Sequence, residues 1–556
     1  MLATIAILVT ILYFVFAGVL KSQPGQSSKQ FFFMDRTATI GNYVDTTVAY
    51  SLQVAVTIYF VFWGYRYGWS NMWFVLTWCI GIFLFSLAAP RLATVLQQHE
   101  TMLSFLAAKS LILRRVSAVL VVLSLFGLMY TELFFTAQFL GTSLTLYSPG
   151  LSFSAWYWIT FLMLLLVITA YVSLGGAQKV VATDKQQLLL AYVAAAVFFI
   201  ALQEEVAKSG AAIFYWTYIP ILLTYLGLTL GCAVSAMISK GGSYRSFRLF
   251  PGEYSFASTY APFFCAIAVG ISILNPPLFG TNSRSDFPKS IWSMIEGPEH
   301  GVWALIGFGL ANLIWQFSDY TAYHRLALLN LPAEHRQRTE QIRRSILATM
   351  LASPLTWSLG IFAGMAIDAT DLVHTDKYGQ EVFNSFTIAL IQGSQGGNLA
   401  LYTALVSLGV VLIAVMLSTV DSAFISAGKL LMMDFAPERA LTVRFRVACL
   451  LLCSSALTLF AASHAYFQTN VFTALGVFYS WGLVFGPVMI YRLFADKFSI
   501  TAAMTAIILG SMGGAIGALY PLGLPTLVSN VASQLLAMAI AAIVLFASWI
   551  FSRRAT

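Results

Sequence analysis

The chain of 556 residues is too apolar to be a soluble protein, because 59% of it is hydrophobic and only 9% is charged. Soluble domains carry about 25% charged residues, whereas a bilayer buries helices of about 20 apolar residues each. The apolar runs follow one another too closely to leave room for soluble domains. We therefore expect one polytopic, all-α membrane domain.

Apolar runs bounded by charges and by Pro and Gly clusters predict about fifteen transmembrane helices. They are expected near 2–20, 40–63, 69–89, 117–140, 155–173, 187–203, 211–238, 259–279, 301–322, 345–367, 399–424, 447–465, 471–491, 500–520 and 529–551.

The positive charges predict an orientation. With the N-terminus outside, the inner loops hold 25 of the 30 Lys and Arg residues. Basic residues stay cytoplasmic because translocating them is unfavourable, so we expect the N-terminus out and the C-terminus in, in the inner or plasma membrane. The net charge of +8 is then a topology signal and requires no nucleic-acid partner.

Four acidic residues fall within or near the ends of predicted spans: Asp45, Glu132, Asp319 and Asp421. A bare carboxylate in the bilayer costs about 3 kcal/mol on insertion scales, so such residues usually face the bundle interior or a watery cavity. The alternative is that each lies near an interface or bonds a neighbouring hydroxyl.

One segment between two predicted spans carries a Tyr, a Gly pair, a Val, a Thr-Asp pair and a Gln: Tyr171, Gly175, Gly176, Val180, Thr183, Asp184 and Gln187. This string resembles the sodium:solute symporter family, which includes sodium/proline, sodium/sugar and sodium/pantothenate symporters. A Gly pair permits a turn with positive φ, and Thr183 or Asp184 can cap the next helix. An ordinary capped helix–loop–helix would explain the Gly and Asp residues but not the whole string.

Three further segments are similar to the entry of the family's first core helix and to its sixth and eighth core helices. They are residues 35–38, residues 307–320 with Arg325, and residues 416–422 with 433–435.

The resemblance implies a leucine-transporter-like fold of two inverted five-helix repeats, whose first and sixth core helices break near the middle of the bilayer. Residues 45–58 contain no Gly or Pro, so nothing local predicts the first break. The implied organisation is a peripheral helix and inner loop at 1–36, a first repeat at 37–210, an inserted helix pair and outer loop at 211–300, a second repeat at 301–495 and two peripheral helices at 496–556. The inserted helices at 211–279 depart from the family pattern, and packing or a partner surface is their simplest role.

The family's sodium site maps onto two hydroxyls and three backbone carbonyls: Ser418 and Thr419, with Val415, Ala49 and Leu52. Broken helices free carbonyls that can bind an ion. Alternatively, the two hydroxyls bond back to carbonyls of their own helix. Asp184 aligns with an acid near the family's cytoplasmic ion exit. Asp421 lies one turn below Ser418, where it would raise cation affinity or help release the ion inward.

The solute site is expected between core helices 1, 3 and 6, with Trp315 as a lid. Its candidate residues are Asn312, Trp315, Gln316, Glu132, Tyr50, Gln53 and Asp319, although aromatic and amide residues in spans more often pack or anchor. An ionised Glu132 or Asp319 would favour a cationic solute, and a protonated one would permit proton coupling.

These features predict a secondary active transporter that imports a small polar organic solute together with Na⁺. The sequence contains no phosphate-binding loop and no paired metal-ligand motif, so nothing in it suggests an enzyme or an ATPase. A proton-coupled carrier of the same fold is the nearest alternative, and a transporter-like solute receptor is a second. A channel is disfavoured because no filter-forming segment repeats.

Overall fold

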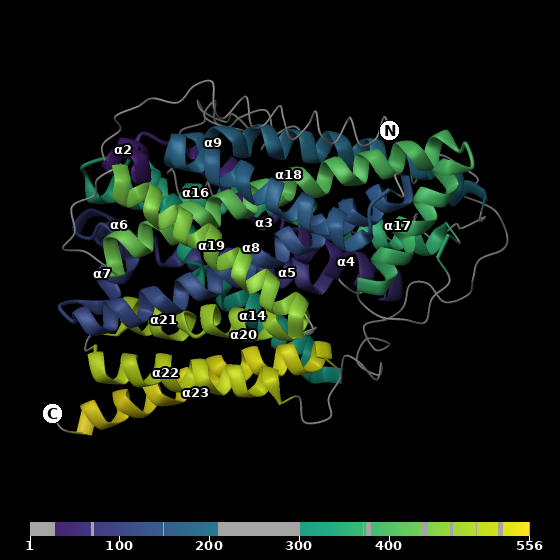
Figure 1. Ribbon diagram of the computed structural model, residues 1–556. Helices are drawn as coiled ribbons and strands as arrows, with labels where there is room; N and C mark the ends of the chain where they lie inside the picture. The colour runs from purple at the N-terminus through teal and green to yellow at the C-terminus, as the bar shows by residue number, and fades with distance from the viewer. Residues whose placement is uncertain are drawn as a thin grey trace, which may run out of the picture.

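The computed structural model describes residues 28–67, 72–147, 150–208, 301–370, 372–373, 380–435, 443–467, 471–495, 498–520 and 526–554. These residues form a bundle of helices, with one isolated β-bridge between Ala38 and Leu329 (Figure 1). The predicted spans 2–20, 211–238 and 259–279, including the inserted pair, lie outside the described residues.

The first half of the described chain contains eight α-helices and a single 3₁₀ turn at Met34–Arg36. The α-helices are α2 (Ser28–Phe33), α3 (Ile40–Ser51), α4 (Val54–Tyr67), α5 (Met72–Leu87), α6 (Ala89–Gln98), α7 (Met102–Ala107), α8 (Leu111–Tyr147) and α9 (Phe153–Lys208).

The second half begins at residue 301, and its longest helix, α18, continues into a π-helical segment at Leu430–Phe435. The helices are α14 (Gly301–Ser318), α15 (Tyr320–Leu328), α16 (His335–Ala369), α17 (Gln380–Gln395), α18 (Leu399–Lys429), α19 (Val443–Phe467), α20 (Val471–Leu483), α21 (Phe485–Phe494), α22 (Ile500–Leu519) and α23 (Thr526–Arg554).

Among the described residues, seven helical stretches are long and apolar enough to cross a bilayer. The number is nine when the bent pairs α3–α4 and α5–α6 each count as one span. The protein is therefore a multi-pass membrane protein, as its composition predicts.

The predicted fifteen spans do not correspond one to one with helices. The spans 40–63, 301–322 and 471–491 are each divided into two helices, whereas 155–173 and 187–203 both belong to the kinked α9. The structure also adds α6 and α7 in a predicted inner loop and α17 in a predicted outer loop. Amphipathic and short loop helices lack the long apolar run by which spans are recognised, which is why they were missed.

The first core helix is broken even though residues 45–58, around the break, contain no Gly or Pro. α3 ends at Ser51, α4 begins at Val54, and their axes meet at 59°. Leu52 leaves helical geometry at φ −82° and ψ 64°. The backbone N–H groups of Val54 and Ala55, at the start of α4, donate to the two carboxylate oxygens of Glu132 at 2.6 and 3.1 Å. A carboxylate on α8 thus supplies the acceptors that a continuous helix would have provided.

The sixth core helix breaks at Asp319, between α14 and α15. Asp319 has φ −74° and ψ 102°, and its side chain accepts from the backbone N–H of Thr321 at 2.9 Å and from its hydroxyl at 2.6 Å. This is ordinary N-capping by a local acid. Both breaks therefore place a carboxylate at the N-terminus of the second half-helix, where the helix dipole favours negative charge.

The positive φ predicted for the Gly pair is found at Gly176, with φ 57° inside α9. The predicted cap is wrong. The Thr183 hydroxyl donates to the carbonyls of Lys179 and Val180 at 2.9 Å, well inside the helix, and Asp184 bonds to other helices.

The loops that were predicted to be cytoplasmic, as far as the structure describes them, meet at one end of the bundle. The helices α2, α6 and α7 lie together at this end (Figure 1). Arginine side chains tie these loops to one another through backbone carbonyls: Arg36 to Leu96, Arg338 to Ala93, Arg492 to Phe105 and Arg115 to Phe435, at 3.2–3.3 Å. Burial, followed by the charges of Arg492 and Arg114, lowers the pKa of the nearby His99 imidazole.

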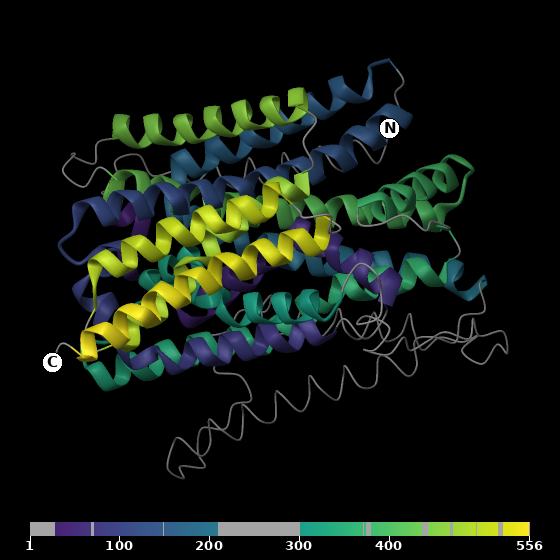
Figure 2. The same cartoon turned by 90° about the horizontal axis from the view of Figure 1, so that it is seen from below.

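At the other end, α17 joins segments that are far apart in sequence. Gln395 donates to the carbonyl of Leu146 at 3.0 Å, and Asn398, which follows α17, donates to Glu205 at 2.8 Å. Figure 2 shows α22 and α23 side by side across one face of the bundle, where they pack against α20 and α14.

Candidate functional site

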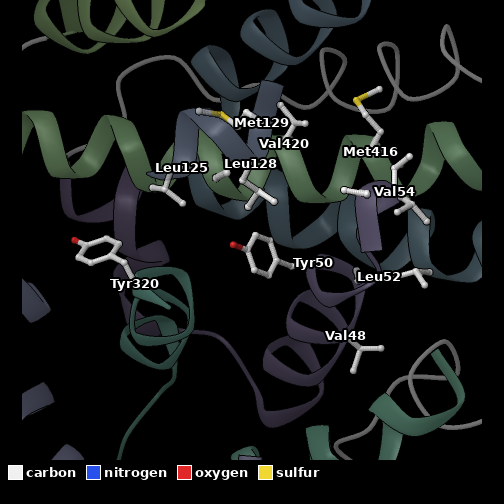
Figure 3. Packing of buried hydrophobic residues seen from close by; sticks show 14 of the residues in the cluster. Val48, Tyr50, Leu52, Val54, Leu125, Leu128, Met129, Tyr320, Met416 and Val420 are labelled. Atoms are coloured by element: carbon white, nitrogen blue, oxygen red, sulfur yellow. The ribbon is translucent and has the colours of Figure 1, made fainter. Parts of the chain in front are cut away.

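The broken end of α3 lies against the middle of α18. The Thr419 hydroxyl donates to the backbone carbonyl of Tyr50 at 3.4 Å, and the Ala49 carbonyl accepts from the N–H of Leu52 at 3.3 Å. Figure 3 shows four residues of this break together with two residues of α18: Val48, Tyr50, Leu52 and Val54, with Met416 and Val420. The residues predicted to bind sodium therefore fall on the two sides of one contact: Ala49 and Leu52 at the break, and Val415, Ser418 and Thr419 on α18.

The two hydroxyls do not bond back to their own helix. Ser418 donates across to Asp184 on α9 at 2.6 Å, and Thr419 bonds to α3. The other oxygen of Asp184 accepts from the hydroxyl of Thr46 on α3. Asp184 is fully buried, so its carboxylate joins α3, α9 and α18 at the predicted ion site. The structure thus brings Asp184, expected on the exit path, into contact with a predicted ligand.

Two further buried carboxylates lie on the same interface. Asp421 accepts from the Tyr171 hydroxyl at 2.5 Å and from Thr183 at 3.5 Å, so it faces α9 one turn beyond Ser418. Asp45 forms an ion pair with Lys185 at 3.8 Å. Asp421 therefore bonds neighbouring hydroxyl groups, which was the alternative considered for acids within predicted spans. Asp45 instead forms an ion pair with a lysine.

The predicted solute residues divide among different places. Gln53, Asn312 and Trp315 line one cavity, whereas Tyr50, Asp319 and again Trp315 line a second. Glu132 is fully buried, and both of its oxygens are used at the start of α4. Gln316 is buried and lines neither of these two cavities. The structure thus brings part of the predicted set together and gives Glu132 a capping role.

The larger cavity, of about 120 Å³, lies among the second half of the first core helix, α5, α14, α16 and α20. Its wall is mostly aromatic, and the polar contributions come from Gln53, Asn312, Gln534 and tyrosine hydroxyls. The aromatic lining residues are Tyr59, Phe60, Trp63, Phe74, Trp78, Phe308, Trp315, Trp357 and Tyr479.

The smaller cavity, of about 30 Å³, lies between α3, α8, the α14–α15 break and α20. Trp315 and Tyr479 line both cavities, and their rings meet edge to face at 5.4 Å. The Tyr479 hydroxyl donates to the amide oxygen of Gln53 at 3.1 Å, which fixes its ring beside the first helix break. This pair of rings therefore belongs to the walls of both cavities.

Arg325 is a buried cation on α15 that lies over the ring of Tyr50, one of the residues lining the smaller cavity. Its guanidinium lies 4.0 Å from the centre of the Tyr50 ring and donates to Thr321 at 2.9 Å. The arrangement is a cation–π contact in a desolvated site, and it holds α15 against the last turn of α3.

At the end of the bundle where α6 and α7 lie, Asp434 joins four parts of the chain. It accepts from Arg114 at 2.8 Å, from Thr101 at 2.5 Å and from the Tyr320 hydroxyl at 3.4 Å. Because Tyr320 opens α15, this contact connects the second half of the broken sixth helix to α8 and α18.

Sequence reasoning missed Tyr479, Trp78 and Trp357 as cavity residues. Aromatic residues are common in membrane spans as packing and interface anchors. Their spacing along one chain does not show which rings surround an empty volume, so no sequence signal separates them.

The chain matches no protein-family profile, and no curated protein matches it by sequence. Solved structures do match its fold. A Na⁺-coupled sialic acid symporter in a substrate-bound outward-open state superposes with a TM-score of 0.64 at 13% identity, covering 98% of this chain and 97% of that one. A manganese transporter of Eremococcus coleocola superposes with a TM-score of 0.50 at 15% identity, covering 96% and 98%.

At such identities the likeness shows the fold alone, which is a leucine-transporter-like fold. That part of the sequence prediction is confirmed. Membership of the sodium:solute symporter family is not shown by sequence.

Proposed function

We propose that the protein is a secondary active transporter that imports a small organic solute together with Na⁺ by alternating access. The observation that carries this proposal is the contact between the broken first core helix and the paired hydroxyls of α18. Ser418 and Thr419 both point across this contact, to Asp184 and to the Tyr50 carbonyl.

This contact offers what a sodium ion requires. Broken helices expose backbone carbonyls, and their ends coordinate Na⁺ in transporters of this kind. The site combines carbonyls of the break, two hydroxyls and the buried carboxylate of Asp184, whose negative charge would balance the ion. In this proposal Asp421, one turn further along α18, lies on the path by which the ion leaves.

The proposed orientation places the N-terminus outside and the C-terminus in the cytoplasm of the inner or plasma membrane. Its support is the meeting of the arginine-rich loops at one end of the bundle. Translocating such a group of cations would be unfavourable. The two five-helix repeats at 37–210 and 301–495 are part of the same proposal.

In this proposal, solute occupies the cavities on the two sides of the Trp315–Tyr479 pair. Movement of these rings would connect the cavities, and the Asp434 contacts would close the inner end while the outer one is open. Gln53, Asn312 and Trp315 are the predicted solute residues that line the larger cavity.

A proton-coupled carrier is the second candidate, because one observation favours it. Asp184 and Asp421 are both fully buried, and each accepts hydrogen bonds from hydroxyl groups of neighbouring helices. Burial disfavours the charged form of a carboxyl, so such a group can hold a proton instead of binding an ion.

Measuring uptake by the purified full chain in proteoliposomes distinguishes sodium coupling from proton coupling. Replacing external Na⁺ by choline at fixed pH should abolish uptake driven by a sodium gradient, whereas unchanged uptake would exclude sodium coupling. Ser418→Ala combined with Thr419→Ala should raise the half-saturating Na⁺ concentration at least tenfold. Ser407→Ala, another buried hydroxyl on α18, is the matched control and should leave that concentration unchanged.

A further inference from the structure

The smaller cavity contains a carboxylate oxygen that no hydrogen bond uses. Asp319 is only partly buried and lines this cavity. Its Oδ1 accepts from the backbone N–H and the hydroxyl of Thr321, whereas Oδ2 accepts no hydrogen bond from the described residues. Oδ2 also keeps accessible surface, unlike Oδ1 of Asp421, which packing closes off completely. An acceptor that carries negative charge is therefore open to the cavity.

Two hydroxyl oxygens from other helices line the same cavity, and neither forms a hydrogen bond with the described residues. They belong to Tyr50 on α3 and Ser124 on α8. Figure 3 shows the Tyr50 hydroxyl on the side of its ring that faces Leu125 and Tyr320, which also line this cavity. Ser124 fits against α20 because residue 482 is Gly, where a Cβ would lie 2.6 Å from the Ser124 Oγ.

These three oxygens match the donors of an ammonium group. An ammonium group has three N–H donors and no acceptor, and its hydrogen bond to a carboxylate is strengthened by charge. The cavity of about 30 Å³ suits a group of this size, since one water molecule needs about 10–15 Å³. The polar side of the smaller cavity therefore favours a compact cation with several N–H groups.

The cation already nearby does not occupy this position. Arg325 donates to the Thr321 hydroxyl at 2.9 Å, and that hydroxyl donates to Oδ1 of Asp319 at 2.6 Å. Among the described residues, no ion pair joins Arg325 to Asp319, and Arg325 does not line the cavity. The guanidinium thus acts through Thr321 on the Oδ1 side, and Oδ2 is left for a ligand.

The larger cavity restricts the rest of the ligand. It shares Trp315 and Tyr479 with the smaller one, so a solute anchored there would extend into it. No Asp, Glu, Lys, Arg or His is among the described residues that line the larger cavity. A carboxylate would lose its hydration there without gaining a countercharge, which is costly in an apolar environment. The remainder of the solute should therefore be uncharged and apolar.

We propose that the smaller cavity binds the ammonium group of a small primary amine whose apolar body occupies the larger cavity. The ammonium N–H groups donate to Oδ2 of Asp319 and to the hydroxyl oxygens of Tyr50 and Ser124. Amino acids are poor ligands in this arrangement, because their carboxylate has no partner. As the class of the transported solute, this inference rests on the proposed transport function.

Binding to the purified full chain in detergent with NaCl at neutral pH tests the proposal, using 2-phenylethylamine as the probe. The amine should bind, whereas 2-phenylethanol, which has a hydroxyl in place of the ammonium group, should bind about tenfold more weakly. Phenylalanine, which adds a carboxylate, should bind more weakly than the amine. Equal affinity for the amine and the alcohol would overturn the proposal without any change to the protein.

Asp319→Asn keeps an oxygen to cap α15 and removes the charge, so the tenfold preference for the amine over the alcohol should disappear. Ser124→Ala removes one acceptor and should weaken amine binding by roughly 3- to 10-fold. Ser117→Ala is the matched control, because Ser117 lies on the same helix, is buried and does not line the cavity. It should bind the amine as the parent does. An unchanged preference for the amine in Asp319→Asn would refute the proposed anchor.

A sodium ion is the other occupant that these oxygens could hold, and the same variants identify it. If added NaCl displaces the amine, and Asp319→Asn raises the half-saturating Na⁺ concentration while amine binding is unchanged, the cavity is an ion site and the proposal is wrong. Amine binding that is independent of NaCl concentration at this site supports the ammonium assignment.

The same preparation distinguishes the failure of this inference from failure of the proposed function. If proteoliposomes show sodium-driven uptake of another solute and 2-phenylethylamine does not bind, the ligand class is wrong and the transport proposal stands. If the amine binds as described but no sodium gradient drives its uptake, the ammonium site stands and the transport proposal fails.

Discussion

The Glu132 carboxylate is expected to hold the first helix break together, and its removal gives the sharpest test of the fold. Both of its oxygens accept backbone N–H groups at the start of α4, at 2.6 Å from Val54 and 3.1 Å from Ala55. The carboxylate and the residues around it are buried. Glu132→Ala would therefore leave two N–H groups without an acceptor in a site that water does not reach.

The expected loss of stability follows from these two hydrogen bonds. An unsatisfied buried donor costs about 1–3 kcal/mol, so Glu132→Ala should lower the free energy of unfolding by about 2–6 kcal/mol. Glu132→Gln keeps one carbonyl oxygen as an acceptor. It should cost about half as much, with a further loss of about 0.3–1 kcal/mol because the negative charge at the helix N-terminus disappears.

Thermal unfolding of the full chain in detergent, followed by intrinsic fluorescence, measures the order of these effects. Thr131→Val is the matched control, because the Thr131 hydroxyl donates only to the Gly127 carbonyl of its own helix, at 2.6 Å. The expected order of stability is parent and Thr131→Val, followed by Glu132→Gln, followed by Glu132→Ala. If Glu132→Ala were as stable as Thr131→Val but lost uptake, Glu132 would contact solute and the capping argument would be wrong.

Two further predictions concern a kink and an ion pair. Gly176→Ala should destabilise the chain by about 1–3 kcal/mol, because residue 176 has φ 57° and a Cβ there would lie 2.5 Å from the Phe31 carbonyl oxygen. Arg114→Ala should destabilise more than Asp434→Ala, because the first removes the ion-pair partner of a fully buried carboxylate, whereas the second leaves a side chain that is 22% exposed to water. The same unfolding measurement reports both.

The glycine prediction has a matched control variant, and each of the two predictions has a result that would contradict it. Gly150→Ala meets no atom within 4 Å and should be nearly neutral, so equal losses at residues 150 and 176 would contradict the steric argument. For the ion pair, a larger loss from Asp434→Ala than from Arg114→Ala would mean that the hydroxyl bonds of Asp434, and not its charge pairing, dominate.

Much of the candidate ion site was predictable from the sequence, because its parts lie in short motifs of defined spacing. Ser418 and Thr419 are adjacent on one helix, and the structure places them opposite Ala49 and Leu52, as the family resemblance implied. The role of these residues as ligands stays a prediction. The bond from Ser418 to Asp184 joins residues 234 positions apart and has no local signal.

The solute site was predicted only in part. Asn312, Trp315 and Gln53 line the larger cavity, but most of its wall consists of rings that look like ordinary packing residues in the sequence. A cavity is the space that several helices leave unfilled, so its lining depends on how those helices pack and not on any one of them.

The sequence by itself determined that this is a helical membrane protein, because its apolar surface can be buried only in a bilayer and its backbone must then bond internally. The break at Asp319 has a local cause, since this acid caps the following helix, although the apolar run at 301–322 had predicted one continuous span. Only the tertiary structure decided the break after Ser51. The acceptors that make this break possible belong to Glu132, 78 and 77 residues further along the chain than Val54 and Ala55. A helix whose missing hydrogen bonds are supplied by a distant residue needs no Gly or Pro at the break.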